Sequence, residues 1–370
     1  MPLSLLIAGG GTGGHLYPGI AVARELMARV PDAQVAFVGT AAGIEARVIP
    51  REGFALDLIR SAGVKGKSLP AIARAVGLMP LSAADAWQAI SRRRPSVVVG
   101  VGGYSSGPVV LLAALRGVPT LLMEQNAVPG LTNRLLAPVV NAAAVTYQES
   151  VRFFGDKAFV SGNPVRSEFF RKQEPERDQE EGAHGHDGLP PGAARVLVFG
   201  GSQGAHAINM AMVEAASRLA AATPRVAITH QTGERDLEMV RDGYRRAGLE
   251  ARVEPFLYAM DREMRAADLV VSRAGATTLA ELTACGKPSI LVPLPTATDD
   301  HQRRNAAALV KEGAALMVEQ RELSGDRLAA GILALAGDAG RRKDVGEAAR
   351  RLARPDAARV IVDRLLTLAR

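Results

Sequence analysis

Cysteine and aromatic residues are scarce in this chain of 370 residues. The single cysteine, Cys285, excludes an intramolecular disulfide and is typical of a protein kept in a reducing compartment. Phenylalanine, tryptophan and tyrosine make up only 4% of the residues, and no aromatic motif alternates with the basic ones. We therefore expect no binding to nucleic acid, despite the net charge of +7.

Long hydrophobic runs are also scarce. The stretch 96–115 has no charged residue, but its centre at 102–108 reads GGYSSGP. This centre predicts a strand, a loop and a helix, because a membrane span with that sequence would strain or expose backbone polar groups. We therefore expect no transmembrane segment. The positive net charge instead favours attraction to an anionic membrane surface.

Short apolar runs alternate with helix-like stretches along the chain, which is typical of parallel α/β folds. The predicted strands are 3–8, 34–38, 97–101, 119–123 and 142–146 in the first half, and 195–199, 225–229, 268–271 and 289–292 in the second. At this length we expect two domains.

Two of these strands lead into a glycine-rich turn and then into a helix. The first turn spans 9–15 and ends in His15, and the second spans 200–205. Glycines let backbone N–H groups approach an anion, and the N-terminus of the next helix adds partial positive charge. Ligands of open parallel sheets bind beyond the carboxyl ends of the strands, so we expect two Rossmann-like domains that face a cleft.

The glycines of the first turn also fit the G-x-G-x-x-G spacing of dinucleotide-binding folds. Such folds place an acidic residue at the end of the next strand, where it binds the ribose. The strand 34–38 is instead followed by Gly39 and Thr40, and Glu45 is the nearest carboxylate beyond it. Binding of NAD is therefore a weaker alternative to binding of another nucleotide or of a phosphorylated substrate.

The two halves are separated by residues 172–194, which are acidic, rich in glycine and proline and nearly free of apolar side chains. We expect a mobile loop there, and a solvated linker explains its His184 and His186 better than a metal site does. We place the two domains at 1–165 and 166–354. The amphipathic stretch 355–370 should form a helix that packs against the N-terminal domain.

One further helix start stands out in the second half. Gly275 follows a predicted buried strand and opens a helix whose first turns carry Thr278 and Glu281. Small residues there allow a phosphate to approach, and the carboxylate could accept hydrogen bonds from both hydroxyls of a ribose. An equally strong interpretation is that Glu281 only interacts with the dipole of its helix and binds no ribose.

Seven motifs occur in order along the chain, at 9–15, 102–108, 124–130, 162–166, 200–205, 273–281 and 300–306. Together they resemble the MurG family of bacterial N-acetylglucosaminyltransferases. The resemblance extends from near residue 3 to about residue 320, and the ordered set is far more specific than any single motif. It implies the GT-B architecture of two Rossmann-like domains.

The resemblance also implies a reaction. The family transfers N-acetylglucosamine from UDP-GlcNAc to the 4-hydroxyl of N-acetylmuramic acid on lipid I, with inversion, and forms lipid II for peptidoglycan. It implies no metal and no other cofactor. It further implies peripheral attachment to the cytoplasmic face of the plasma membrane, with other cell-wall synthesis proteins as further partners.

Inversion by single displacement requires a base for the acceptor hydroxyl. His15 is the candidate, because its place at a helix N-terminus disfavours the imidazolium and keeps the ring able to accept a proton. A structural or phosphate-contacting histidine is the alternative.

The resemblance assigns the remaining site residues. Those near the acceptor and the sugar are Thr12, Gly13, Gly14 and Asn126, with Tyr104 and Glu124 as weaker acceptor-side candidates. Those that border the nucleotide are Arg273, Ala276, Thr277 and Thr278. Leu257 would offer backbone groups to uracil, Glu281 would bind the ribose, and Gln302 would bind the GlcNAc hydroxyls. Ser202 and Arg166 would meet the charge of the leaving diphosphate.

The segment 65–94 is the expected membrane surface. Its basic residues are Lys65, Lys67, Arg74 and Arg92 to Arg94, and its apolar residues are Ile72, Val76, Leu78, Met79 and Leu81. An apolar patch surrounded by cations favours anionic lipid. The alternative is an ordinary amphipathic helix that packs on the sheet.

Two other functions stay open. Another GT-B transferase with a glycolipid acceptor would differ at 102–108 and 124–130, which should shape the acceptor pocket. A non-catalytic sensor of nucleotide sugars would need Ser202 and Glu281 but not His15.

Overall fold

The computed structural model describes residues 2–63, 73, 76–171, 193–201 and 204–370. The chain forms two compact units, Met1–Arg166 with Arg354–Arg370, and Ser167–Ala353. Arg166, expected from the sequence at the start of the second domain, belongs to the first unit, where its guanidinium lies 4.8 Å from the ring centre of Tyr17. Most of the loop expected at 172–194 lies outside the described residues.

The first unit contains a seven-stranded parallel sheet with the order β3-β2-β1-β4-β5-β6-β7. Its strands are β1 Ser4–Gly9, β2 Gln34–Gly39, β3 Ala55–Leu58, β4 Val97–Gly102, β5 Thr120–Glu124, β6 Ala142–Val145 and β7 Ala158–Val160. The central strands are buried almost throughout because helices cover both faces, which explains their continuous apolar sequences.

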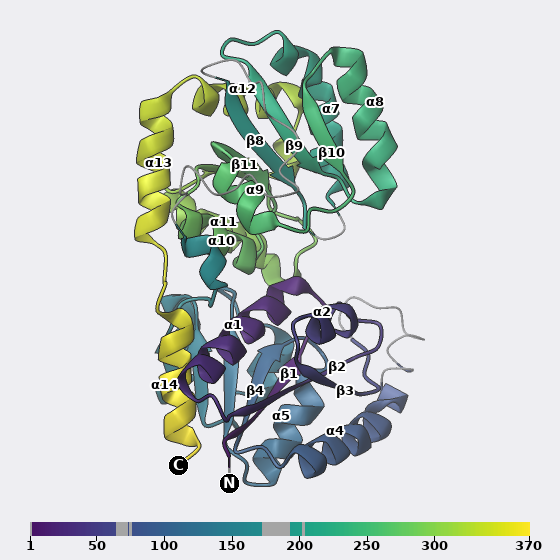
Figure 1. Cartoon of the computed structure of the whole chain (residues 1–370), viewed down its shortest axis with the longest axis vertical. Helices are drawn as coiled ribbons and strands as arrows, with labels where there is room; N and C mark the ends of the chain where they lie inside the picture. The colour runs from purple at the N-terminus through teal and green to yellow at the C-terminus, as the bar shows by residue number, and fades with distance from the viewer. Residues whose placement is uncertain (1, 64–72, 74–75, 172–192, 202–203) are drawn as a thin grey trace. The chain divides into compact units, whose positions relative to one another are not determined.

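Among the described residues of this unit, the α-helices are α1 Gly13–Arg29, α2 Glu45–Arg51, α4 Met79–Arg93, α5 Ser106–Leu115, α6 Leu131–Leu136 and α14 Ala357–Leu368. Alternate residues of β1 enter different cores: Leu5 and Ile7 pack in the cluster that includes α1 and α14, while Leu6 and Ala8 pack in the one that includes α4 and α5. The C-terminal helix α14 therefore lies beside α1 (Figure 1), and residues 354–370 belong to the N-terminal unit.

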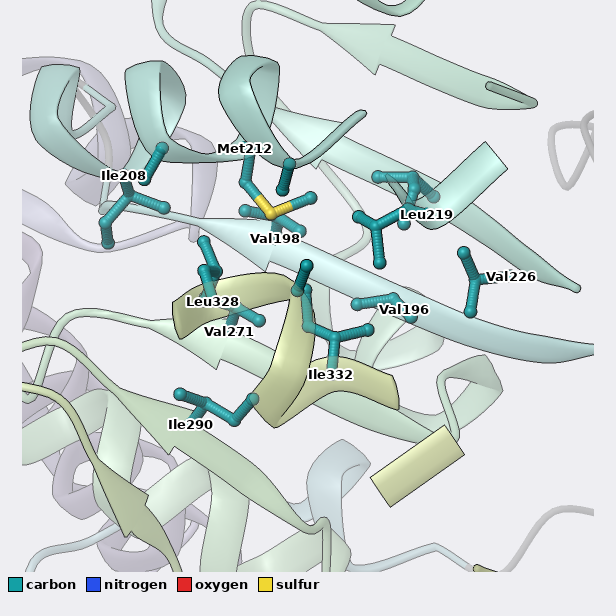
Figure 2. Packing of buried hydrophobic residues seen from close by; sticks show 14 of the residues in the cluster. Val196, Val198, Ile208, Met212, Leu219, Val226, Val271, Ile290, Leu328 and Ile332 are labelled. Carbon is teal, nitrogen blue, oxygen red and sulfur yellow. The ribbon is translucent and has the colours of Figure 1, made fainter. Parts of the chain in front are cut away.

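The second unit contains a six-stranded parallel sheet with the order β10-β9-β8-β11-β12-β13. Its strands are β8 Ala194–Phe199, β9 Val226–Gln231, β10 Ala251–Glu254, β11 Leu269–Ser272, β12 Ser289–Leu291 and β13 Leu316–Met317. Its helices are α7 His206–Ala220, α8 Leu237–Ala247, α9 Met260–Ala266, α10 Ala276–Cys285, α11 His301–Lys311, α12 Gly325–Ala336 and α13 Ala339–Arg351. Met212 of α7, Val198 of β8 and Ile332 of α12 meet in one apolar cluster (Figure 2).

All nine strands predicted from the sequence are present, each within two residues of the predicted bounds. The sequence analysis missed β3, β7, β10 and β13, which are the edge strands of the two sheets. None of the described helices is long and apolar enough to cross a membrane.

A buried histidine makes the stability of the second unit depend on pH. His230 lies fully buried, with Nδ1 2.7 Å from the Tyr244 hydroxyl and Nε2 3.0 Å from Oδ1 of Asn209. Burial lowers its pKa from 6.5 to about 3. A histidine whose pKa is lower in the folded state stabilises the fold above its unfolded pKa, and this contribution is lost as the pH falls toward the folded pKa.

We predict that the free energy of unfolding falls as the pH decreases from 6.5 toward 3, and that His230→Gln flattens part of this fall because glutamine does not titrate. Chemical denaturation of both proteins over this pH range measures the difference. Parallel pH profiles for the two proteins would contradict the assignment.

Candidate functional site

The predicted acceptor-side residues lie at the carboxyl edge of the first sheet. They belong to the loops after β1, β4 and β5, which are neighbouring strands in the order β1-β4-β5. Thr12 to His15 follow β1, Tyr104 follows β4 and Asn126 follows β5. The sheet therefore brings three of the sequence motifs to one edge, where parallel α/β sheets bind their ligands.

The turn after β1 is held by the buried carboxylate of Glu45, the first residue of α2. Its Oε2 accepts a hydrogen bond from the N–H of Gly11 at 2.8 Å, and its Oε1 accepts from the N–H of Thr40 at 2.8 Å. A Cβ atom at Gly10 would lie 2.5 Å from Oε2 of this carboxylate, so a larger residue there would displace the carboxylate from its hydrogen bonds. Glu45 therefore binds backbone, which is not the ribose-binding role that the NAD alternative requires.

His15 lies in the first turn of α1, and its Nδ1 is 3.1 Å from Oε1 of Gln125. Gln125 is buried, and its Nε2 donates to the carbonyl oxygen of Val101 at 3.1 Å. Gly102 closes the same side of the ring, because a Cβ atom on it would lie 2.8 Å from Nδ1 of His15. The imidazole is thus enclosed at Nδ1 by the ends of β4 and β5.

Gly102 provides a test of this enclosure. We predict that Gly102→Ala lowers turnover by about tenfold or more, because the new methyl group displaces the ring that must be positioned within a fraction of an ångström. Gly102 also has a φ of +97°, so the substitution should destabilise the fold by about 1–3 kcal/mol.

Gly117→Ala is the matched control, because Gly117 has a φ of +72° and open space at its Cβ position. It should lose stability and retain turnover, as steady-state kinetics and thermal denaturation of both variants would show. An equal fall of turnover in the two variants would contradict a specific effect on His15.

Glu124 organises the loop after β5. Its Oε1 accepts from the N–H of Asn126 at 3.0 Å and from Nδ2 of Asn126 at 3.2 Å. Its Oε2 accepts from the N–H of Gly130 at 3.1 Å and from Nδ2 of Asn133 at 2.8 Å. Both oxygens are thus occupied by the loop that presents Asn126, and the direct contact of Glu124 with an acceptor stays a prediction.

Tyr104 lies half-buried beside the glycine turn. Its hydroxyl is 3.4 Å from Oγ1 of Thr40, and a Cβ atom on Gly11 would lie 3.6 Å from its ring. The structure therefore brings Tyr104 together with the turn that contains Thr12, Gly13 and Gly14. Its contact with a substrate also stays a prediction.

The predicted nucleotide-binding residues lie at the carboxyl edge of the second sheet. Gly275 is the N-cap of α10, and no side chain caps this helix through a described hydrogen bond. Thr277 and Glu281 are both largely buried, and their spacing of four places them on one face of α10. Ala276 and Thr278 belong to the same helix start, which leaves backbone N–H groups suited to an anion.

Two side chains fix the loops around this helix start. Nη1 of Arg273 donates to the carbonyl oxygens of Val292 at 3.1 Å and Pro293 at 3.3 Å, and burial lowers the pKa of Arg273. Oε1 of Gln302 accepts from the N–H groups of Ala274 at 3.2 Å and Leu294 at 3.0 Å. This arrangement orients the amide of Gln302 so that its Nε2 is the group left to donate to a sugar hydroxyl.

Gln231, at the end of β9, joins two further loops. Its Nε2 donates to the carbonyl oxygen of Gly201 and its Oε1 accepts from the N–H of Leu257, both at 2.8 Å. Since the N–H of Leu257 already has this partner, a contact of Leu257 with uracil would use its carbonyl oxygen. Ser202 lies outside the described residues.

Sequence reasoning did not assign Glu45, Gln125 or Gln231 to the site. Gln125 lies inside the motif 124–130 between two assigned residues, and Gln231 ends a correctly predicted strand. Both glutamines share a feature that the sequence shows: each is a polar residue at the carboxyl end of a buried strand. A side chain at that place contacts the backbone of a loop rather than solvent.

A metal site is not evident in the part of the chain that the structure describes, where no group of three or more His, Cys, Asp or Glu side chains could hold an ion. A metal-independent reaction stays a prediction from the sequence.

Comparison with known proteins first defines the class. Residues 5–145 match the glycosyltransferase family 28 N-terminal domain, and residues 195–361 match the glycosyltransferase family 28 C-terminal domain. The two parallel sheets and these matches define a glycosyltransferase with the GT-B fold, as the sequence predicted.

Individual relatives narrow the class further. A protein of Pelobacter propionicus named "UDP-N-acetylglucosamine--N-acetylmuramyl-(pentapeptide) pyrophosphoryl-undecaprenol N-acetylglucosamine transferase" is 52% identical over 379 residues, covering 99% of each chain. A protein of Geobacter sulfurreducens with the same name is 47% identical, covering 100% of this chain and 99% of the relative. The crystal structure of Acinetobacter baumannii MurG is similar with a TM-score of 0.75 and 28% identity, covering 99% of this chain and 100% of that one. The chain therefore belongs to the MurG family.

Proposed function

We propose that this protein transfers N-acetylglucosamine from UDP-GlcNAc to the 4-hydroxyl of N-acetylmuramic acid on undecaprenyl-pyrophosphoryl-MurNAc-pentapeptide, forming lipid II from lipid I. The observation that carries the proposal is the identity of about half of all residues, over the full length, to transferases whose names state both substrates. The arrangement of loops at the carboxyl edges of both sheets supports it.

The proposed reaction is a single displacement. The acceptor oxygen forms a bond with C1 of GlcNAc while the bond from C1 to the UDP oxygen breaks, and UDP leaves with the electron pair. The acceptor hydroxyl must lose a proton, and His15 is the group at the first carboxyl edge that we assign as its base. Attack on the face opposite the leaving group inverts the configuration at C1.

Donor binding is assigned to the second unit. The backbone N–H groups at the start of α10 would bind the diphosphate, and Glu281 would accept hydrogen bonds from the ribose hydroxyls. Gln302 would donate from Nε2 to the sugar, since its Oε1 already accepts two backbone hydrogen bonds. These interactions require no metal, and we extend the proposal to a metal-independent reaction.

We predict that His15→Ala lowers turnover by ~10²–10⁴-fold, which is the usual size of the contribution of a general base. Transfer of labelled GlcNAc to lipid I measures the rate, and calorimetry with UDP measures donor binding. UDP should bind the variant as it binds the wild type, because the proposed donor contacts belong to the second unit. Near-normal turnover would remove His15 from the base role.

We also propose peripheral attachment to the cytoplasmic face of the plasma membrane. Val76, Met79 and Trp87 expose 52%, 63% and 52% of their surfaces, although apolar side chains of this size are usually covered. Leu115 of the neighbouring helix α5 is 72% exposed, and the guanidinium of Arg116 lies 4.3 Å from the ring centre of Trp87. These apolar side chains with a cation among them suit an anionic lipid surface.

Part of the membrane surface expected at 65–94 lies outside the described residues. This part includes the cations Lys65, Lys67 and Arg74 and the apolar residue Ile72. Arg93 donates from Nε to Oδ2 of the buried Asp57 at 2.8 Å, so its charge is already compensated within the unit. Arg93 therefore ties α4 to β3, and we no longer count it among the lipid-binding cations.

We predict that Met79→Ser combined with Trp87→Ser weakens binding to anionic vesicles by about tenfold or more, because each buried apolar side chain contributes about 1.5 kcal/mol or more. Met210→Ser is the matched control, since Met210 is a half-exposed methionine of the second unit. Co-sedimentation with vesicles at low and high salt measures both. Wild-type binding by the double variant would place the membrane surface elsewhere.

A further inference from the structure

Gln125 makes two hydrogen bonds that together determine its orientation. Its Nε2 donates to the carbonyl oxygen of Val101 at 3.1 Å, and its Oε1 lies 3.1 Å from Nδ1 of His15. The side chain is 2% exposed, so water does not compete for either group. A backbone carbonyl can only accept, which requires the NH₂ of the amide to face Val101 and the oxygen to face the imidazole.

The orientation of the amide in turn determines the tautomer of His15. Oε1 of Gln125 is only an acceptor, so the nitrogen opposite it must carry a hydrogen. If Nδ1 were unprotonated, two lone pairs would face each other at 3.1 Å. Gly102 packs against the same nitrogen, since a Cβ atom on it would approach Nδ1 to 2.8 Å.

We propose that Gln125 is a positioning residue that keeps the proton of neutral His15 on Nδ1 and thereby assigns Nε2 as the atom that accepts the proton of the acceptor hydroxyl. This inference rests on the proposed role of His15 as the base. As the acceptor oxygen bonds to C1 and UDP leaves, its proton moves to Nε2, and the resulting imidazolium donates from Nδ1 to Gln125. The imidazolium later releases the proton to water, which restores the neutral ring.

An amide suits this position better than a carboxylate would. A carboxylate beside Nδ1 would favour the imidazolium before the substrate arrives, and a protonated ring cannot act as a base. The neutral amide oxygen orients the ring and accepts from Nδ1 both before and after the proton transfer, without placing a negative charge beside it.

The direct test is the ¹⁵N spectrum of the histidines in the full chain, recorded without substrate at a pH at which His15 is neutral, with His15→Ala used to assign its signals. We expect a protonated Nδ1 and an unprotonated Nε2 in the wild type. In Gln125→Leu we expect a substantial population of the tautomer protonated at Nε2, and a fall of kcat by about 10- to 100-fold with little change in the KM for UDP-GlcNAc.

Two further variants complete the test. Gln34→Leu is the matched control, because Gln34 is an exposed glutamine at the start of β2, and it should keep both tautomer and turnover. Gln125→Glu keeps an acceptor oxygen opposite Nδ1 but adds a charge that favours the imidazolium, so its turnover should reach a plateau only at a higher pH than that of the wild type. A pH profile identical to that of the wild type would contradict the inference if the leucine variant does not fold.

A wild-type ring protonated at Nε2 would overturn the inference. So would a Gln125→Leu protein that loses turnover but keeps the wild-type tautomer, since that result would show a purely structural role. Normal turnover of His15→Ala would instead refute the proposed base, while the spectrum would still report whether Gln125 sets the tautomer.

Discussion

The carboxylate of Glu45 lies buried between the turn after β1 and the turn after β2 and accepts hydrogen bonds from both. A carboxylate removed from water requires such donors, and here the backbone supplies them. The glycines around it follow from this constraint, because Cβ atoms at Gly10, Gly39 and Gly43 would lie within 2.1–2.5 Å of its atoms. The glycine turn that leads to His15 therefore depends on one buried acidic side chain.

Buried side chains hold loop backbone in the same way at the carboxyl edges of both sheets. Glu124 holds the loop that presents Asn126, Gln231 joins the loops after β8 and β10, and Gln302 joins those after β11 and β12. Loop backbone that carries catalytic or binding groups must be fixed before the substrate arrives if its hydrogen bonds are to favour the transition state. The parallel sheets place these loops, and the buried side chains then set their conformation.

The sequence predicted the central strands and missed the edge strands for two physical reasons. Strands buried on both faces have continuous apolar sequences, whereas β3 contains Asp57 and β10 contains Arg252. The edge strands β7 and β13 are apolar but are only 3 and 2 residues long, too short to give a recognisable pattern. The ordered motifs identified the family, and through it they supplied the candidate site residues. They did not assign Gln125, because its role depends on the contact between β5 and α1, which are distant in the sequence.

Buried side chains fix the functional loops in the absence of substrate. Amide hydrogen exchange can show this at Gly11 and Thr40, which donate to Glu45, and at Ala274 and Leu294, which donate to Gln302. In the substrate-free protein these four amides should exchange slowly, as amides within the sheets do. Exchange at the rate of an unstructured peptide would contradict the claim, because it would show that the loops form only when substrate binds.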